Sequence, residues 1–391
     1  MRPGFCILPL QCREARVSFI RFLHTDSLRL GSPISGLSDS PDWLRKAAGS
    51  AVRTAVTNLI EAAIAGRCQL LLIAGKLTES SQDLGPAITW LKAQTLVLRG
   101  HGIQLVIAGH PESDHAALRR LDAILVAPGQ RLDVWPNGSE RILCQVSPVS
   151  TPGRAGALGI EVGTESGRRP QADLAYVAVP SLTPSSTSDS IDGVASAHDR
   201  LLRMSAGCPQ SIGPMERGTF GCQLVDVDLS RHLLTARSCV TDVIRFAQEL
   251  VSCRQGMAAS ELGELLRDRS RLLSTNGRCT MVVEWVIDGQ LTLSGAMLEP
   301  LCEFDLLKEL RSGLHAGHSG AWPHRIRFSD SSTVDASQHP SIAAKEFTAV
   351  VRERILKFSQ CNRLIENSSA GIPLGAGSEA AVGLDLLRRV A

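Results

Sequence analysis

Hydrophobic residues in the first third of the chain follow the patterns of alternating strands and helices. An aromatic and β-branched stretch at 17–23 predicts a strand, and continuous apolar runs at 68–75 and 103–110 predict strands that are buried on both faces. Apolar residues recur with helical spacing at 42–67, and another helix is predicted at 84–100. This alternation indicates an α/β fold class, with a central sheet flanked by helices.

The pattern becomes richer in strands after residue 110. A helix at 112–120 and a strand at 121–128 continue the alternation. The next segment, 131–149, predicts a hairpin in which Asn137 and Gly138 form a type I′ turn. Further strands are predicted at 157–164, 173–182 and 221–229.

A second unit is expected to begin near residue 240. A helix at 258–274, strands at 278–287 and 290–298 and a helix at 303–314 predict a small α+β domain. An amphipathic helix follows at 340–360. We therefore expect an N-terminal arm at 1–16 that is disordered or follows from a misplaced start codon, a main domain at 17–238, an α+β domain at 239–335, and C-terminal helices and a tail at 336–391.

Composition narrows the function classes only a little. The formal net charge is +2 with 20% charged residues, which gives no whole-chain electrostatic argument for binding nucleic acid or a membrane. The eleven cysteines include no C-x-x-C pair, which argues against a zinc ribbon and for free thiols in a reducing compartment. No stretch approaches the roughly 18 apolar residues of a membrane span. A cytoplasmic protein is expected.

The order of several segments resembles the calcineurin-like metallophosphoesterases, and within them the DNA-repair exonuclease branch, the nuclease subunit of SbcCD-type complexes. Six landmarks carry the resemblance in family order: FLHTDSLRLG, AAIAGRCQLLLIAGKLTES, GIQLVIAGHPES, ALGIEVGTES, DLAYVAVPSL and GCPQSIGPMERGTFGCQLVDVD. The resemblance covers about residues 17–300. It implies a metallophosphoesterase-type β-sandwich flanked by helices, with a small α+β capping domain.

The metal-ligand positions implied by this resemblance are substituted. The family holds two manganese or other divalent ions at the strand ends, but its first Asp and His correspond here to Ser27 and Arg29, and its bridging Asp to Lys76. Its Asn-His pair corresponds to His110 and Pro111, and its later histidines fall on Val162, Pro180 and Leu182. Fixed positive charges at such a site repel divalent cations. The resemblance with these substitutions therefore predicts a catalytically inactive homologue without a metal cofactor.

Two other uses of these residues stay open. Arg29, Lys76 and His110 can be read as a phosphate-binding or DNA-binding set, while the ordinary interpretation is that the two cations form salt bridges with Glu79, Asp83 or Glu112. A rebuilt metal site would instead draw on His24, Asp26, His110 and Glu112. Strand parity places His24 and Asp26 on one side, and Ser27 on the other.

The resemblance implies a non-catalytic role as a scaffold or DNA-binding subunit of a repair complex. The family's partner is a coiled-coil ATPase of the SbcC type that binds C-terminal helices, and the helix at 340–360 suits such docking or packing on its own domain. The rival hypotheses are an active phosphohydrolase or exonuclease with a rearranged metal site, and a relic with a new protein-binding role. A homodimer is left open.

Overall fold

The computed structural model divides the chain into two compact units, Met1–Val334 and Asp335–Ala391, and every residue described below belongs to the first. The expected N-terminal arm, the strand at 290–298 and the helix at 340–360 lie outside the described residues. The structure describes residues 19–108, 110–126, 132–134, 144–147, 158–162, 174–178, 201–229, 231–254, 257–273, 279–288, 300–312, 314 and 321–329.

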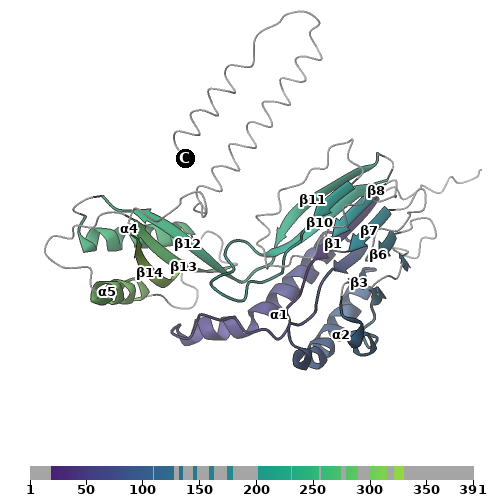
Figure 1. Ribbon diagram of the computed structural model, residues 1–391, viewed down its shortest axis with the longest axis horizontal. Coiled ribbons are helices and arrows are strands. Elements are labelled where there is room, and N and C mark those ends of the chain that lie inside the picture. The colour runs from purple at the N-terminus through teal and green to yellow at the C-terminus, as the bar shows by residue number, and fades with distance from the viewer. Residues whose placement is uncertain are drawn as a thin grey trace, which may run out of the picture. The chain divides into compact units, whose positions relative to one another are not determined.

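A mixed sheet with the strand order β11-β10-β1-β2-β3-β4 forms the centre of this unit (Figure 1). Strands β1 to β4 are parallel, whereas β10 is antiparallel to β1 and to β11. Because parallel strands end at the same edge of a sheet, the segments that follow β1, β2 and β3 emerge side by side. The bounds are β1 Phe19–Thr25, β2 Leu70–Ile73, β3 Gln104–Ala108, β4 Ile124–Val126, β10 Gly221–Asp228 and β11 Leu233–Val240.

A second sheet packs against one face of the first. Its strands are β5 (Leu132–Val134), β6 (Cys144–Ser147), β7 (Leu158–Val162), β8 (Leu174–Ala178) and β9 (Leu201–Met204), in that order. Strands β5 and β6 are antiparallel, which confirms the pairing of the predicted hairpin. Buried side chains from both sheets share one core, in which the rings of Phe22 and Tyr176 meet edge to face at 5.0 Å. The two sheets therefore form the two layers of a sandwich.

A third sheet consists of the parallel strands β12 (Ile244–Ser252), β13 (Thr280–Asp288) and β14 (Trp322–Ser329). The helices α4 (Ala259–Leu273) and α5 (Pro300–Arg311) connect them, so the order is βαβαβ. This arrangement is α/β, and the expected α+β arrangement is wrong for these strands. The sequence pattern predicts neither β12 nor β14, and without them the two helices do not read as crossover connections.

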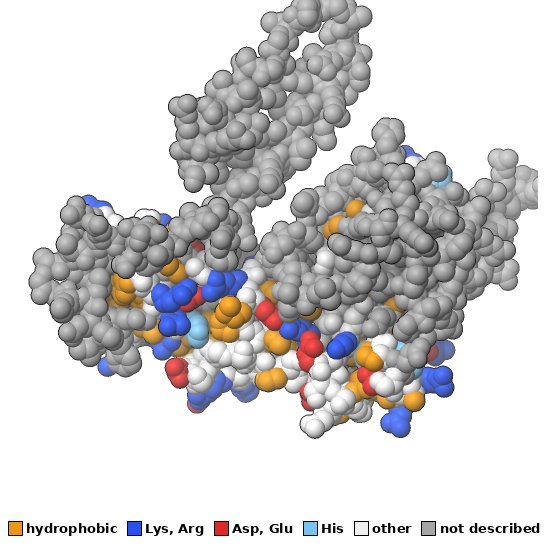
Figure 2. Space-filling view, in the orientation of Figure 1, with side chains coloured by type: hydrophobic (Ala, Val, Ile, Leu, Met, Phe, Trp, Pro, Cys, Tyr) orange, Lys and Arg blue, Asp and Glu red, His pale blue; other side chains and the backbone are white. Residues whose placement is uncertain are grey.

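The face drawn in Figure 2 carries side chains of both charges. Among the side chains coloured in Figure 2, lysine and arginine are interspersed with aspartate and glutamate, as the net charge of +2 suggests. Of the helices that the structure describes, none is both long enough and apolar enough to cross a bilayer.

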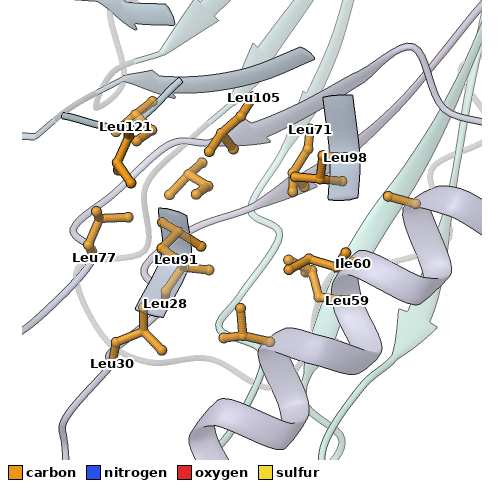
Figure 3. Close-up of a cluster of buried hydrophobic side chains, with 14 of the residues drawn as sticks. Leu28, Leu30, Leu59, Ile60, Leu71, Leu77, Leu91, Leu98, Leu105 and Leu121 are labelled. Atoms are coloured by element: carbon orange, nitrogen blue, oxygen red, sulfur yellow. The ribbon is translucent and has the colours of Figure 1, made fainter. Parts of the chain in front are cut away.

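Helices cover the other face of the central sheet. The two long ones, α1 (Asp42–Ala65) and α2 (Leu84–Gly100), end within two residues of their predicted bounds, and the short α3 (His115–Leu118) follows β3. Apolar side chains of α1 and α2 meet those of the strands and of the segment after β1 in one buried cluster (Figure 3). The labelled members are Leu28, Leu30, Leu59, Ile60, Leu71, Leu77, Leu91, Leu98, Leu105 and Leu121.

The core between the two sheets gives a stability prediction. Phe22 is fully buried there, so Phe22→Ala is expected to lower the free energy of unfolding by about 3–5 kcal/mol. Phe19 lies on the same strand and is 41% exposed, so Phe19→Ala is the matched control and should cost less than about 1 kcal/mol. Urea denaturation followed by circular dichroism measures both values. Equal losses would contradict the two-layer core.

Candidate functional site at the carboxyl ends of the central strands

Backbone hydrogen bonds join the segments that follow the central strands. The segment after β1 runs beside the segment after β2, because the Leu28 N–H donates to the Lys76 carbonyl at 2.9 Å and the Leu30 N–H to the Leu77 carbonyl at 2.8 Å. On its other side, the Asp26 N–H donates to the carbonyl of Gly207, after β9, at 3.0 Å. Residues from both sheets of the sandwich therefore meet at this end.

A buried polar cluster lies on the sandwich side. His24 Nδ1 is 2.7 Å from the hydroxyl of Tyr176, and His24 Nε2 is 3.5 Å from Asp26 Oδ1. The other carboxylate oxygen of Asp26 accepts hydrogen bonds from the Ser205 hydroxyl and the Gly207 N–H, each at 3.2 Å. His24 and Asp26 thus share a side, as strand parity predicts. Tyr176, the only tyrosine of the chain, belongs to this cluster, and no sequence pattern singles it out.

Burial fixes the protonation of this cluster. It lowers the pKa of His24 to about 3, so the imidazole is neutral at physiological pH. Burial also raises the pKa of Tyr176 well above its ordinary value, and the nearby negative charge of Asp26 acts in the same direction. The His24–Tyr176 hydrogen bond therefore joins two neutral groups.

Ser27 faces away from that cluster and holds the neighbouring segment. Its hydroxyl oxygen accepts a hydrogen bond from the Lys76 N–H at 3.1 Å. A Cβ atom at position 75 would lie 2.6 Å from Ser27 Oγ and 3.1 Å from the backbone of Asp26 and Ser27, so a larger residue than glycine would displace Ser27. The side chain of Lys76 is exposed to solvent. Ser27 therefore serves to pack the two segments together.

Arg29 is the most constrained residue of the site. It is only 6% exposed and has a left-handed backbone, with φ of 57°. Its guanidinium donates two hydrogen bonds to the carboxylate of Glu216, at 2.7 and 2.8 Å, and a third to Glu79 at 3.1 Å. Burial lowers the pKa of Arg29, but the hydrogen bonds and charge of these carboxylates outweigh it, and the pKa is raised. For Arg29, the ordinary interpretation of a salt bridge with Glu79 is confirmed, and for Lys76 it stays a prediction.

Glu216 is the partner that the sequence analysis misses. It stands 187 residues from Arg29, and its carboxylate also accepts a hydrogen bond from the Ile212 N–H at 2.9 Å. Glu216 lies within the last landmark of the family resemblance, which is the signal that could have pointed to it. Cys208, in the same landmark, has a pKa that burial raises to about 12, so its thiol stays protonated at neutral pH.

His110 lies after β3 and is 3% exposed. Its Nδ1 atom is 3.3 Å from the carboxylate of Asp114, in the single helical turn that starts after Pro111. Burial lowers the pKa of His110, the Asp114 charge opposes this shift, and the positive charge of Lys76 adds a smaller lowering. His110 and Lys76 are thus electrostatic neighbours, as the phosphate-binding hypothesis requires, whereas Arg29 is committed to its two glutamates.

The residues that the structure describes do not fit a pair of divalent cations. Among them, no group of three or more His, Cys, Asp or Glu side chains is arranged to hold a metal ion. The buried guanidinium of Arg29 lies at these strand ends, and the carboxylates of Glu216 and Glu79 are hydrogen-bonded to it and not directed to a metal position. Pro180, Leu182 and the side chains of Glu112 and Val162 lie outside the described residues, so the rebuilt set as a whole stays a prediction.

Replacing the buried cation should be costly. Arg29→Met leaves the partly buried carboxylate of Glu216, 15% exposed, without its partner, so we expect a loss of about 3 kcal/mol in unfolding free energy, the low end for a buried pair, measured by urea denaturation. The matched control is Arg99→Ala, which breaks an exposed pair with Asp122 and should cost at most about 1 kcal/mol. A loss for Arg29→Met no larger than for the control would show that Glu216 does not need the guanidinium.

The depressed pKa of His24 predicts a pH dependence of stability. The unfolded chain binds a proton at His24 below its ordinary pKa of 6.5, and the folded chain binds it only near pH 3. Stability from this residue is therefore present above pH 6.5 and is lost as the pH falls toward 3, at about 1.4 kcal/mol per pH unit. His24→Asn should flatten the slope of unfolding free energy against pH by about that amount. Identical slopes in both proteins would contradict a neutral, buried His24.

Comparison with models of known protein families and with curated proteins finds no match to this chain. The resemblance to the metallophosphoesterases therefore rests on the order of landmarks in the sequence, and every activity that it implies is a proposal.

Proposed function

We propose that this chain is a homologue of the DNA-repair-exonuclease metallophosphoesterases that no longer hydrolyses phosphodiesters and acts as a scaffold or DNA-binding subunit. Two features support the proposal. Because β1, β2 and β3 are parallel, the substituted landmark residues that follow them lie at one edge of the sheet. The second sheet and the flanking helices complete the two-layer arrangement that the resemblance implies.

The observation that carries the proposal is the state of Arg29. In the family this position provides a metal-binding imidazole, and here it provides a cation locked by Glu216 and Glu79. A guanidinium has no lone pair to offer to a metal ion, so this position supplies no ligand. The glutamates that could attract metal are already hydrogen-bonded to the guanidinium.

A DNA-binding role depends mainly on Lys76. Its side chain is exposed at the strand ends, and its charge contributes to lowering the pKa of His110, whereas the charge of Arg29 is compensated. Phosphate contacts of this kind bind DNA without reading its sequence, and their strength falls as salt rises. The mixed charges in Figure 2 mean that such binding would depend on a local site and not on the net charge of the chain. The coiled-coil ATPase partner remains part of the proposal, since the helix at 340–360 lies outside the described residues.

One observation favours a second candidate, an active phosphohydrolase with a rearranged site. His24 Nε2 and Asp26 Oδ1 lie 3.5 Å apart, and imidazole and carboxylate are usual ligands of catalytic metals. His110 and Glu112 would have to complete that set.

A single preparation distinguishes the candidates. The full chain is equilibrated with Mn²⁺ and desalted, its metal content is measured by mass spectrometry, and the same sample is tested for cleavage and binding of labelled DNA. We expect no stoichiometric manganese, no cleavage, and DNA binding that weakens with salt. Lys76→Ala should weaken binding several-fold and reduce the slope of log affinity against log salt by about 0.9.

The matched control is Lys92→Ala, which removes an exposed lysine from α2 and should leave DNA binding unchanged. Stoichiometric manganese together with DNA cleavage that is lost in Asp26→Asn would overturn the proposal in favour of the rearranged hydrolase. Absence of DNA binding and of cleavage would refute the DNA-binding role and favour a subunit that contacts only other proteins.

A further inference from the structure

Two cysteines face each other across the antiparallel edge of the central sheet. Cys222 of β10 and Cys239 of β11 are direct partners in the strand register. Paired residues in such a ladder have Cα atoms about 4.5 or 5.5 Å apart, and both values lie within the range of about 4.4–6.8 Å that a disulfide requires. The pair lies on the face covered by the helices, beside the buried Cys68.

The two side chains lie close together. The Cys222 thiol donates a hydrogen bond to the Cys239 carbonyl oxygen at 3.6 Å. The adjacent Gly221 permits this close approach, because a Cβ atom there would lie 2.0 Å from the same carbonyl oxygen. Since the two residues are register partners, a disulfide between them is compatible with the paired strands.

Their environments give the two sulfurs different reactivities. Cys222 is fully buried, whereas Cys239 is partly exposed on β11, the outermost strand of the sheet in the part of the chain that the structure describes. The hydrogen bond from Cys222 lowers the pKa of Cys239 to about 7 against the opposing effect of burial, and the positive charge of Arg237 assists. Much of Cys239 is thus thiolate at neutral pH. Burial raises the pKa of Cys68 to about 12, which keeps that neighbour protonated.

We propose that Cys239 and Cys222 form a thiol–disulfide exchange site that accepts low-molecular-weight disulfides. The Cys239 thiolate attacks one sulfur of the small disulfide and releases one small thiolate, which leaves a mixed disulfide on Cys239. Burial raises the pKa of Cys222, so its proton leaves only as it attacks Cys239 Sγ, and the second small thiolate departs with that proton as a thiol. The protein loses two electrons and two protons, and the small disulfide is reduced to two thiols.

The product would fasten β11 covalently to β10. Since β11 pairs only with β10 in the described sheet, the bond would hold this edge strand against local opening. The inference does not depend on the proposed function, because it uses the helix-covered face and none of the strand-end residues.

Redox titration of the full chain tests the proposal. The protein is equilibrated with mixtures of oxidised and reduced glutathione, acid-quenched, alkylated and mapped by peptide mass spectrometry. The expected product is a linked Cys222–Cys239 peptide that is lighter by two hydrogen atoms than the reduced pair and reverts with dithiothreitol. Cys222→Ser should instead trap one glutathione on Cys239, and Cys239→Ser should give neither product.

Cys68→Ser is the matched control and should form the Cys222–Cys239 link at the same glutathione ratio as the unmodified chain. The proposal is overturned if both thiols stay reduced at every glutathione ratio, if Cys68 replaces either partner in the link, or if glutathione stays on Cys239 while Cys222 is present. The mapping of the unmodified chain decides the matter even if a variant does not fold.

Discussion

The carboxyl-end site depends on one buried ion pair, between Arg29 and Glu216. Removing a guanidinium and a carboxylate from water costs several kcal/mol for each ion, and two parallel hydrogen bonds at 2.7 and 2.8 Å recover that cost only while both partners stay in place. The pair joins the segment after β1 to the segment before β10, and Glu79 adds the segment after β2. The positive φ of Arg29 directs the chain into this junction. The strand ends are therefore built around a fixed cation.

This constraint also limits the chemistry at the site. General acid–base catalysis works best with a group whose pKa lies near the working pH. The pKa of His24 is about 3 and that of Cys208 about 12, so neither exchanges protons readily at neutral pH. The Asp26 carboxylate accepts hydrogen bonds from Ser205 and Gly207, and the charge of Arg29 is compensated by two glutamates. Such an arrangement suits a structural junction better than a reaction centre.

The parts of the fold that sequence predicts are those in which one local pattern dominates. The apolar runs of β2 and β3 and the helical spacing of α1 leave no competing reading, and the structure has these elements within two or three residues of their predicted bounds. Strand β12 was missed because the buried Glu249 and the paired Arg245 interrupt its apolar pattern, and β14 because Pro323 stands at its second position. Arg245 is paired with Asp242, three residues before it in the chain.

The same distinction applies to the site. Glu79 was a predictable partner of Arg29 because it follows the next strand, and parallel strands bring such segments together. Glu216 and Tyr176 come from segments more than a hundred residues away, and their roles depend on how two sheets stack. Strand parity, a purely local rule, did place His24 beside Asp26.

Strand β10 connects the strand-end site with the Cys222–Cys239 pair. The segment before it is held by the Arg29–Glu216 pair, and its second residue, Cys222, faces Cys239 on β11. Its alternating side chains reach both cores, with Val225 between the sheets and Leu224 under the helices. An ion pair in the folded protein and a disulfide that is made only under oxidation would thus act near the same end of one strand. The first is part of every folded molecule, and the second would leave the strand-end site unchanged while stiffening the sheet edge beside it.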